Sequence, residues 1–288
     1  MTPERSYLIC ATPRSGSTLL CAALGDTNIA GKPAEHFEML IETGRPRQPR
    51  DYFQRSNNLE VWALLDDPEF EAILGGPGGW YAEQPAAEEA PLPPPDFEAL
   101  RQHAFEIGTT PNGVFGTKIM WAYFRDFVRL ARRDGRHAVP PCEVASEVLP
   151  HLSRYIWIWR NDTAKQAVSL WKALQTWSWR QDDDADYTKP ELRYNYAAIA
   201  HLKLRIDEHN LAWQNFFVTC GIEPVKVAYE DFVKDYEGTL LGLLSAVGVE
   251  TPTDFAIKQP TMRRQADKLS DAWVSRFKSE QRARSPFV

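Results

Sequence analysis

A loop near the N-terminus carries the side chains best suited to hold an anion. It consists of five residues, Arg14, Ser15, Gly16, Ser17 and Thr18. An apolar run at residues 7–11 precedes it and apolar residues at helical spacing follow from Leu19, so the pattern predicts a strand, a loop and a helix. Such a loop directs backbone N–H groups, hydroxyls and the positive end of a helix at one point, which suits a phosphate. The pattern by itself also describes an ordinary strand–turn–helix capped by serine.

A second arginine follows a second apolar strand. Residues 155–159 are apolar on both faces, as expected of a strand in the middle of a parallel sheet, and Arg160 comes directly after them. The next helix is predicted to begin with Asn161 or Asp162 as its cap, and its apolar positions form a single stripe. In doubly wound sheets ligands bind at the carboxyl ends of the strands, so each arginine stands where an anion would bind.

Other residues carry less specific signals. Lys118 lies near the end of a predicted strand at residues 114–121, where its side chain either snorkels to the surface or serves an anion site. Glu35 lies at the start of a predicted short helix, where the helix dipole alone would favour an acid. Trp177 offers an aromatic face on which a sugar ring could stack. The acidic run at residues 181–186 could be interpreted as a metal site, but adjacent acids in a polar loop are usually only solvated.

The order of these elements predicts an α/β fold, a P-loop-like three-layer sandwich with a mostly parallel central sheet flanked by helices. Further along, Asp96 is expected to cap a helix that Gly108 ends. A long helix is predicted at residues 191–220, and a short last helix at residues 271–277.

Chain length and loop composition predict one domain over residues 1–288. Residues 75–95 are rich in Gly, Pro, Ala and Glu, which indicates a surface excursion rather than a domain linker. Residues 279–288 are expected to form a frayed tail.

Composition excludes several classes of protein. The net charge of −6 argues against a general nucleic-acid binder, although a local basic pocket for an anion remains compatible with it. The four cysteines are scattered without a C-x-x-C pair, which indicates a reducing compartment and no zinc site, with Cys10 and Cys21 as buried thiols. No signal peptide precedes the first strand and no apolar run could span a bilayer, so we expect a cytoplasmic protein without stable membrane insertion.

Four motifs occur in the chain: the loop with its following leucines at residues 14–20, Gly31-x-Pro33-x-Glu35-x-Phe37, Arg160 with Ser169 on the next helix, and Arg264-Gln265-Ala266-Asp267. Together they resemble the sulfotransferase superfamily, which uses 3′-phosphoadenosine 5′-phosphosulfate (PAPS). Within it, the chain is most similar to the bacterial trehalose 2-sulfotransferase group. The likeness runs over nearly the whole chain, although any one of the motifs is weak evidence.

The resemblance implies roles for the donor-binding residues. The first loop would hold the 5′-phosphosulfate, with Arg14 at the position where many relatives carry lysine. Arg160 and Ser169 would hold the 3′-phosphate, which separates PAPS from ATP or AMP. Lys118 and Arg264 lie in stretches that resemble the family, and we assign both to the cofactor pocket.

The resemblance also bears on the acceptor side of the reaction. Glu35 matches the acid proposed as general base in the trehalose enzyme, where it would take a proton from a sugar hydroxyl during direct in-line transfer without a metal. His36 departs from that enzyme's pattern and is either a second acid/base or merely a neighbour of Glu35. The acceptor is expected to be trehalose or a related glycan, and the family implies a homodimer.

Two alternatives are open. An ATP-dependent phosphotransferase would need a lysine after the glycine of the loop, where this chain has Ser17. A nucleotide- or glycan-binding protein that has lost turnover would keep the loop and lose the base, yet Glu35 is present.

Overall fold

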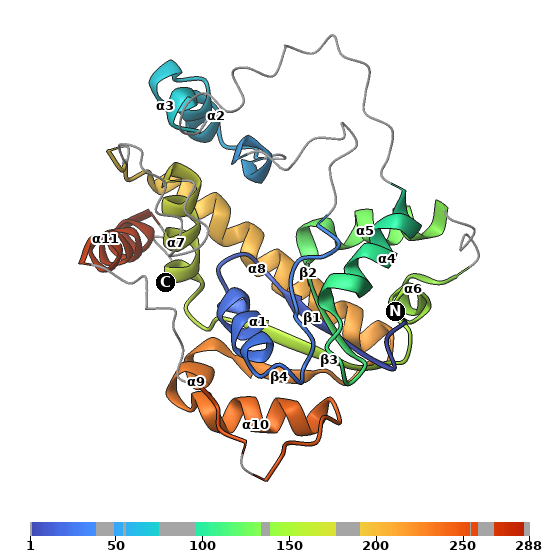
Figure 1. The fold of residues 1–288 in the computed structure, drawn as a ribbon. Helices are drawn as coiled ribbons and strands as arrows, with labels where there is room; N and C mark the ends of the chain where they lie inside the picture. Colours follow the sequence, from blue (N-terminus) through green and yellow to red (C-terminus); the bar gives the residue numbers. More distant parts are fainter. Residues whose placement is uncertain are drawn as a thin grey trace. The chain divides into compact units, whose positions relative to one another are not determined.

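The computed structural model describes residues 2–38, 49–53, 56–74, 96–133, 139–176, 191–253, 255–258 and 268–284. The chain divides into two compact units, and one domain over residues 1–288 stays a prediction. The first unit comprises residues 1–44, 93–161 and 208–261, and the second comprises residues 45–92, 162–207 and 262–288. Figure 1 follows the chain through both units.

A sheet of parallel strands organises the first unit. Its strands are β1 (Arg5–Ala11), β2 (Val114–Met120), β3 (Leu152–Trp159) and β4 (Val225–Ala228). They lie in the order β2-β1-β3-β4, with Ile9 of β1 paired to Lys118 on one side and to Ile156 on the other. β2 is buried along its whole length and β1 beyond its first residue, which explains their nearly continuous apolar sequences. The predicted α/β fold with a parallel central sheet is confirmed.

Helices flank this sheet in the first unit. They are α1 (Ser17–Asp26), α4 (Phe97–Gly108), α5 (Trp121–Arg133), α6 (Pro141–Val148), α9 (Tyr229–Lys234), α10 (Tyr236–Ala246) and the later part of α8 (Tyr196–Thr219). α4 and α5 lie near β2, and α9 lies near β4 (Figure 1). Asp96 caps α4 by accepting a hydrogen bond from the backbone of Ala99 at 3.0 Å, as predicted. Trp213 of α8 donates a hydrogen bond to the carbonyl of Ala11 at 3.0 Å, which ties α8 to the end of β1.

The second unit is helical in its described part. It contains the 3₁₀ helix η1 (Pro49–Phe53), α2 (Leu59–Leu65), α3 (Pro68–Leu74), α7 (Thr163–Thr176), the start of α8, and α11 (Lys268–Arg284). Trp171 of α7 is fully buried there and its ring stacks on Phe70 with centroids 5.2 Å apart. Residues 279–284 belong to α11, which corrects the expected frayed tail for that part. The predicted excursion at residues 75–95 lies outside the described residues.

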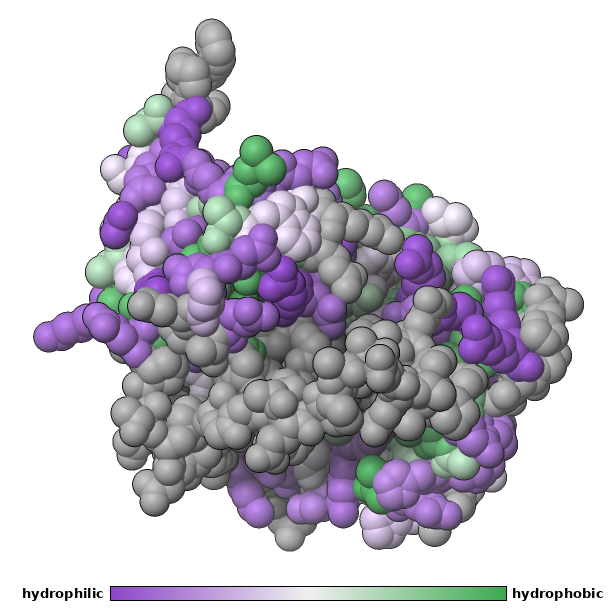
Figure 2. Space-filling view, turned by 90° about the horizontal axis from the view of Figure 1, so that it is seen from above, coloured by the Kyte–Doolittle hydropathy of each residue, from purple (hydrophilic) through white to green (hydrophobic). Residues whose placement is uncertain are grey.

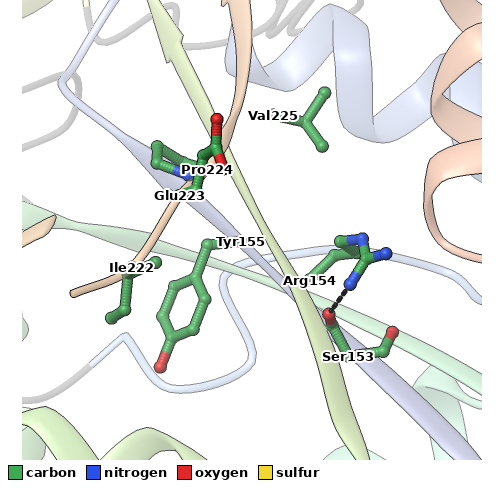
Figure 3. A pocket seen from close by; sticks show the side chains of 7 residues that line it. All are labelled: Ser153, Arg154, Tyr155, Ile222, Glu223, Pro224 and Val225. Carbon is green, nitrogen blue, oxygen red and sulfur yellow. Dashed lines mark hydrogen bonds between the residues drawn. The ribbon is translucent and has the colours of Figure 1, made fainter. Parts of the chain in front are cut away.

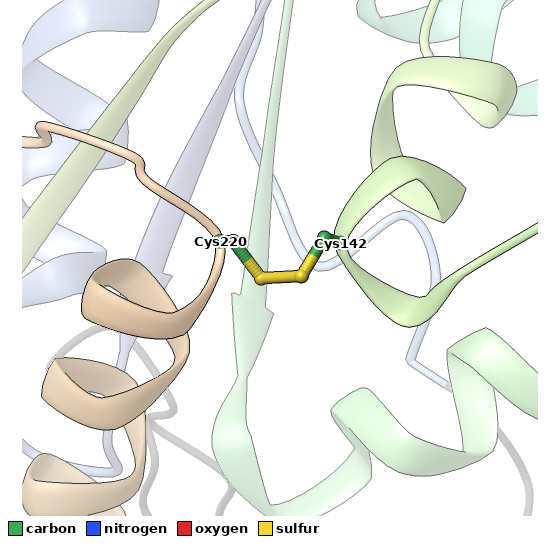
Figure 4. Close-up of a disulfide and its surroundings, with 2 residues drawn as sticks. All are labelled: Cys142 and Cys220. Carbon is green, nitrogen blue, oxygen red and sulfur yellow. A yellow bond between two sulfur atoms is a disulfide. The ribbon is translucent and has the colours of Figure 1, made fainter.

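A disulfide joins two helices of the first unit. Figure 4 shows Cys142 in the first turn of α6 bonded to Cys220, the residue directly after α8. Cys10 and Cys21 are free and buried, as the sequence predicted. A reducing compartment predicts unpaired cysteines throughout, so the Cys142–Cys220 bond contradicts that expectation. No local sequence pattern indicated this pair, because the partners are separated by 78 positions.

The surface of the described residues is mostly hydrophilic on the face drawn in Figure 2, with hydrophobic residues in small groups among them. The most exposed large hydrophobic residues are Leu59 and Val218, each at 82%. Scattered hydrophobic residues are ordinary on protein surfaces and indicate no particular interface. No helix in the described ranges is both long and apolar enough to cross a membrane.

Candidate functional site

The loop after β1 presents backbone and hydroxyl donors at the start of α1. Gly16 adopts the left-handed conformation with φ of 91°, and the backbone of Leu20 donates to its carbonyl at 3.1 Å. Among the described residues no side chain caps α1, and its first turn carries no acidic residue, so its first N–H groups and positive dipole end can face an anion. Ser15 is fully buried, and its hydroxyl has no hydrogen-bond partner among the described residues. A buried hydroxyl of this kind needs a partner, and an anionic group bound to the loop would provide one.

Glu35 is held against β2 by short contacts. Its Oε1 lies 2.9 Å from Nζ of Lys118, and its Oε2 accepts a hydrogen bond from the hydroxyl of Tyr123 at 2.9 Å. The carbonyl of Ala34 accepts a hydrogen bond from the backbone of Lys118 at 2.9 Å, and Ala34 forms a parallel bridge with Thr117. The segment therefore pairs with the edge of the sheet and does not begin the helix that the sequence predicted. Lys118 is nearly buried and does not snorkel, because its side chain is only 5% exposed.

Tyr123 acts as a hydrogen-bond donor in this cluster. Its burial, together with the charge of Glu35, raises the pKa of the phenol well above its ordinary value. The hydroxyl therefore keeps its proton at neutral pH and donates it to the carboxylate. Sequence reasoning missed this residue, because it lies on α5, a helix that was not predicted.

His36 does not share the contacts of the adjacent Glu35. Its Nε2 lies 3.0 Å from the carbonyl of Lys32, and its ring packs against Phe115 with centroids 5.5 Å apart. Burial lowers the pKa of His36, so the ring is neutral at pH 7. The carboxylate of Glu35 instead contacts Lys118 and Tyr123.

Arg160 lies directly after β3 and faces the start of α9. Its guanidinium carbon is 4.8 Å from the centroid of the Tyr229 ring, and its Nε is 3.9 Å from Oε1 of Glu230. Oε2 of Glu230 accepts a hydrogen bond from the backbone of Asn161 at 3.1 Å. The Tyr229 ring also packs against Gly16, because a Cβ on Gly16 would overlap its carbon atoms. The first unit thus brings Arg160 and the N-terminal loop to one aromatic ring.

Tyr229 and Glu230 were not predicted as site residues. The available signal was their position directly after the strand β4, which is the same signal that identified Arg160.

Ser169 lies on α7 in the second unit. Asp162 caps α7 by accepting a hydrogen bond from the backbone of Lys165 at 3.0 Å, which settles the choice between Asn161 and Asp162. Trp177 and Arg264 lie outside the described residues.

A cavity of about 540 Å³ lies elsewhere in the first unit. Figure 3 shows its lining side chains, which come from the amino-terminal part of β3 and from the connection between α8 and β4. Arg154 in this cavity bonds the carbonyl of Ser153 at 2.8 Å. Parallel sheets bind ligands at the opposite, carboxyl ends of their strands, and no predicted site residue lines this cavity. We therefore place the candidate site at the loop after β1 and not here.

The parallel sheet and the glycine-containing loop between β1 and an uncapped helix define an α/β protein with a phosphate-type loop. The family model described as Stf0 sulphotransferase matches residues 6–280. The trehalose 2-sulfotransferase of Mycobacterium tuberculosis (strain ATCC 35801 / TMC 107 / Erdman) is 32% identical over 279 residues, with 96% of this chain and 95% of the relative covered. The trehalose 2-sulfotransferase of Mycolicibacterium smegmatis (strain ATCC 700084 / mc(2)155) is 31% identical over 282 residues, with the same shares covered.

The chain therefore belongs to the Stf0 sulfotransferase family, and it is a sulfotransferase enzyme. The sulfotransferase domain of the Synechococcus PCC 7002 olefin synthase is similar in structure with a TM-score of 0.39 and 17% identity, over 96% of this chain and 88% of that domain.

Proposed function

We propose that this enzyme transfers a sulfuryl group from PAPS to a hydroxyl of trehalose or a related glycan. The relatives are named trehalose 2-sulfotransferase, which supports a sugar acceptor. The observation that carries the proposal is the environment of Glu35, whose two carboxylate oxygens contact Lys118 and Tyr123. Lys118 pairs with Ile9, so this carboxylate stands beside the strand that leads into the phosphate-type loop. A fixed carboxylate near an anion loop is what a general base for an incoming hydroxyl requires.

The residues present fit the donor. The buried hydroxyl of Ser15 and the uncapped start of α1 offer donors to a 5′-phosphosulfate, with Arg14 as the neighbouring cation. Arg160 and Ser169 would hold the 3′-phosphate, and Lys118 and Arg264 would complete the pocket. PAPS would supply an activated sulfuryl group whose bond to the leaving phosphate breaks as the new S–O bond forms.

Different residues of the chain would serve the proton transfer and the stabilisation of the developing charge. Glu35 accepts the proton of the sugar hydroxyl, and the contacts with Lys118 and Tyr123 fix the direction in which it can do so. Negative charge grows on the leaving group, where the N–H groups of the loop and the Arg14 cation would stabilise it. The proposed transfer proceeds without a metal ion.

Replacing Glu35 with glutamine tests this proposal. The Glu35→Gln variant should lose about 100-fold or more of kcat for transfer from PAPS to trehalose, because the amide cannot take the proton. Its binding of 3′-phosphoadenosine 5′-phosphate (PAP), measured by thermal shift, should survive. Glu147→Gln removes an exposed carboxylate on α6 and should retain activity. Full activity in Glu35→Gln would refute its role as base.

The same thermal-shift measurement compares the alternative functions. A ligand at 100 times its Kd stabilises the native state by about 2.7 kcal/mol, which moves the melting point by several degrees. Stabilisation by ATP with Mg²⁺ in preference to PAP would favour a phosphotransferase. Stabilisation by PAP without transfer to any sugar would favour a binding protein.

We further propose a homodimer and a cytoplasmic location. The homodimer comes from the family resemblance. The net charge of −6 favours a small-molecule or glycan acceptor over nucleic acid as the partner.

A further inference from the structure

Arg160 already faces a negative charge within the first unit. Oε1 of Glu230 lies 3.9 Å from its Nε, which is within ion-pair range but too far for a hydrogen bond. The Nε is buried and has no hydrogen-bond partner among the described residues. Meanwhile Oε2 of Glu230 is anchored by the backbone N–H of Asn161 at 3.1 Å. The carboxylate is thus held within ion-pair range of the guanidinium and leaves the Nε donor without a hydrogen bond.

Tyr229 gives this arrangement a fixed geometry. Its ring lies under the Arg160 guanidinium at 4.8 Å and packs on Gly16 of the phosphate-type loop. Tyr229 and Glu230 are the first two residues of α9, and the residue before them, Ala228, pairs with Trp159 at the end of β3. Backbone pairing between β3 and β4 therefore sets the distance between Arg160 and its two neighbours.

We propose that Glu230 is an internal counter-anion for Arg160 that limits the affinity of the enzyme for a 3′-phosphate, and that Tyr229 positions the guanidinium. This inference rests on the proposed function, in which Arg160 binds the 3′-phosphate of the nucleotide. A phosphate that binds Arg160 must share the guanidinium with the carboxylate or displace it. Weaker binding of the 3′-phosphate would speed the release of PAP after each transfer.

The size of the effect follows from Coulomb repulsion. Two like charges about 6 Å apart repel by an amount that corresponds to roughly a threefold loss of affinity at the dielectric constant of water. The loss is larger at a partly buried site, and the side chains of Arg160 and Glu230 are 14% and 37% exposed. Removal of the carboxylate charge should therefore tighten the binding of a 3′-phosphate by roughly three- to tenfold.

The test compares PAP with AMP, which lacks the 3′-phosphate, by isothermal titration of the full chain. Glu230→Gln keeps an oxygen that can accept from Asn161 and removes only the charge. We expect this variant to bind PAP about three- to tenfold more tightly, while the Kd for AMP changes by less than about twofold. Glu230→Ala, which lacks the amide, should change PAP binding in the same direction.

Two controls test whether the change in PAP affinity relative to AMP depends on Glu230 and Arg160. Asp231→Asn removes the same charge from the next, exposed residue of α9 and should leave the ratio of the two Kd values unchanged. Arg160→Ala should weaken PAP far more than it weakens AMP, because the cation proposed to bind the 3′-phosphate is gone.

The possible failures are distinguishable. A wild-type protein that binds PAP no more tightly than AMP would overturn the donor assignment in the proposed function. A wild-type preference for PAP that is unchanged or weakened in Glu230→Gln would overturn the role of Glu230 alone. Equal losses of PAP and AMP binding in Arg160→Ala would show that this guanidinium does not bind the 3′-phosphate, which also overturns the inference.

Discussion

Gly16 determines how closely the phosphate-type loop can approach Tyr229. Two independent constraints act on it, because its φ of 91° lies in the left-handed region and an added Cβ would overlap the Tyr229 ring. The backbone of the neighbouring Arg14 is also left-handed, with φ of 62°. The loop thus turns sharply into α1, and the absence of a side chain at Gly16 leaves room for the ring that also contacts Arg160.

We predict that Gly16→Ala destabilises the protein by about 1–3 kcal/mol, because it adds both backbone strain and a steric overlap. Urea unfolding measures the loss, and titration should show weaker PAP binding. Gly25→Ala is the matched control on α1, since nothing lies within 4 Å of its added Cβ. It should be neutral or stabilising by up to about 1 kcal/mol. Equal stabilities of the two variants would contradict the proposed constraint on Gly16.

At this scale, the sequence predicted the residues that follow apolar strands. The positions of Arg14 after β1 and Arg160 after β3 were predicted in this way, and their roles in donor binding stay predictions. Tyr123 could not be found, because its partner Glu35 is 88 positions away and the contact depends on how α5 packs. Long-range pairs of this kind leave no local pattern in the sequence.

Asp162 connects two helices of the second unit. It accepts a hydrogen bond from the backbone of Lys165 in α7, and its Oδ2 lies 2.9 Å from Nζ of Lys278 in α11. Burial acts to raise the pKa of this carboxyl, but the hydrogen bonds from Lys165 and Lys278 and the two lysine charges outweigh it and lower the pKa. The ionised form is therefore favoured in the folded state.

A lowered pKa in the folded state predicts a specific dependence on pH. The stabilisation by Asp162 is complete above the unfolded pKa of about 4 and is lost as the pH falls through the lower folded value. Asp162→Asn keeps a capping oxygen but cannot ionise, so its Tm should fall less between pH 5 and pH 3 than that of the wild type. Asp271→Asn, at an exposed position 3.9 Å from Lys165, should keep the wild-type profile. Parallel profiles for wild type and Asp162→Asn would exclude this linkage.

Elements with clear start and stop signals were predicted well, as with α4 between Asp96 and Gly108. α5 was missed because it begins at Trp121, directly after β2 and without a turn residue, and its first residues are aromatic with modest helix propensity. The extension of α11 was missed because contacts distant in sequence support it. The Arg284 guanidinium lies 4.2 Å from the Tyr196 ring centroid and its Nη1 lies 3.8 Å from Glu60.

At the scale of the whole chain, the Cys142–Cys220 disulfide closes a loop that contains β3, α7 and α8. The enclosed segment carries Arg160 and Ser169 and passes through both units. A cross-link over 78 positions restricts the unfolded chain strongly, so its main effect is expected on stability. Since disulfides are rare in a reducing cytoplasm, the proposed location implies that the two cysteines would be thiols there.

We predict that loss of this bond lowers the stability of the protein by about 2–4 kcal/mol, or roughly 5–10 °C in Tm, because the unfolded chain regains its loop-closure entropy. Cys142→Ser should show this decrease under oxidising conditions. Dithiothreitol should lower the Tm of the wild type to that of the variant and leave the variant unchanged, which provides an internal control. Both cysteines are only partly buried, so the reductant has access to the bond. If the reduced wild type melts at the same temperature as the oxidised one, the cross-link does not stabilise the fold and the sheet and its helices alone determine the stability.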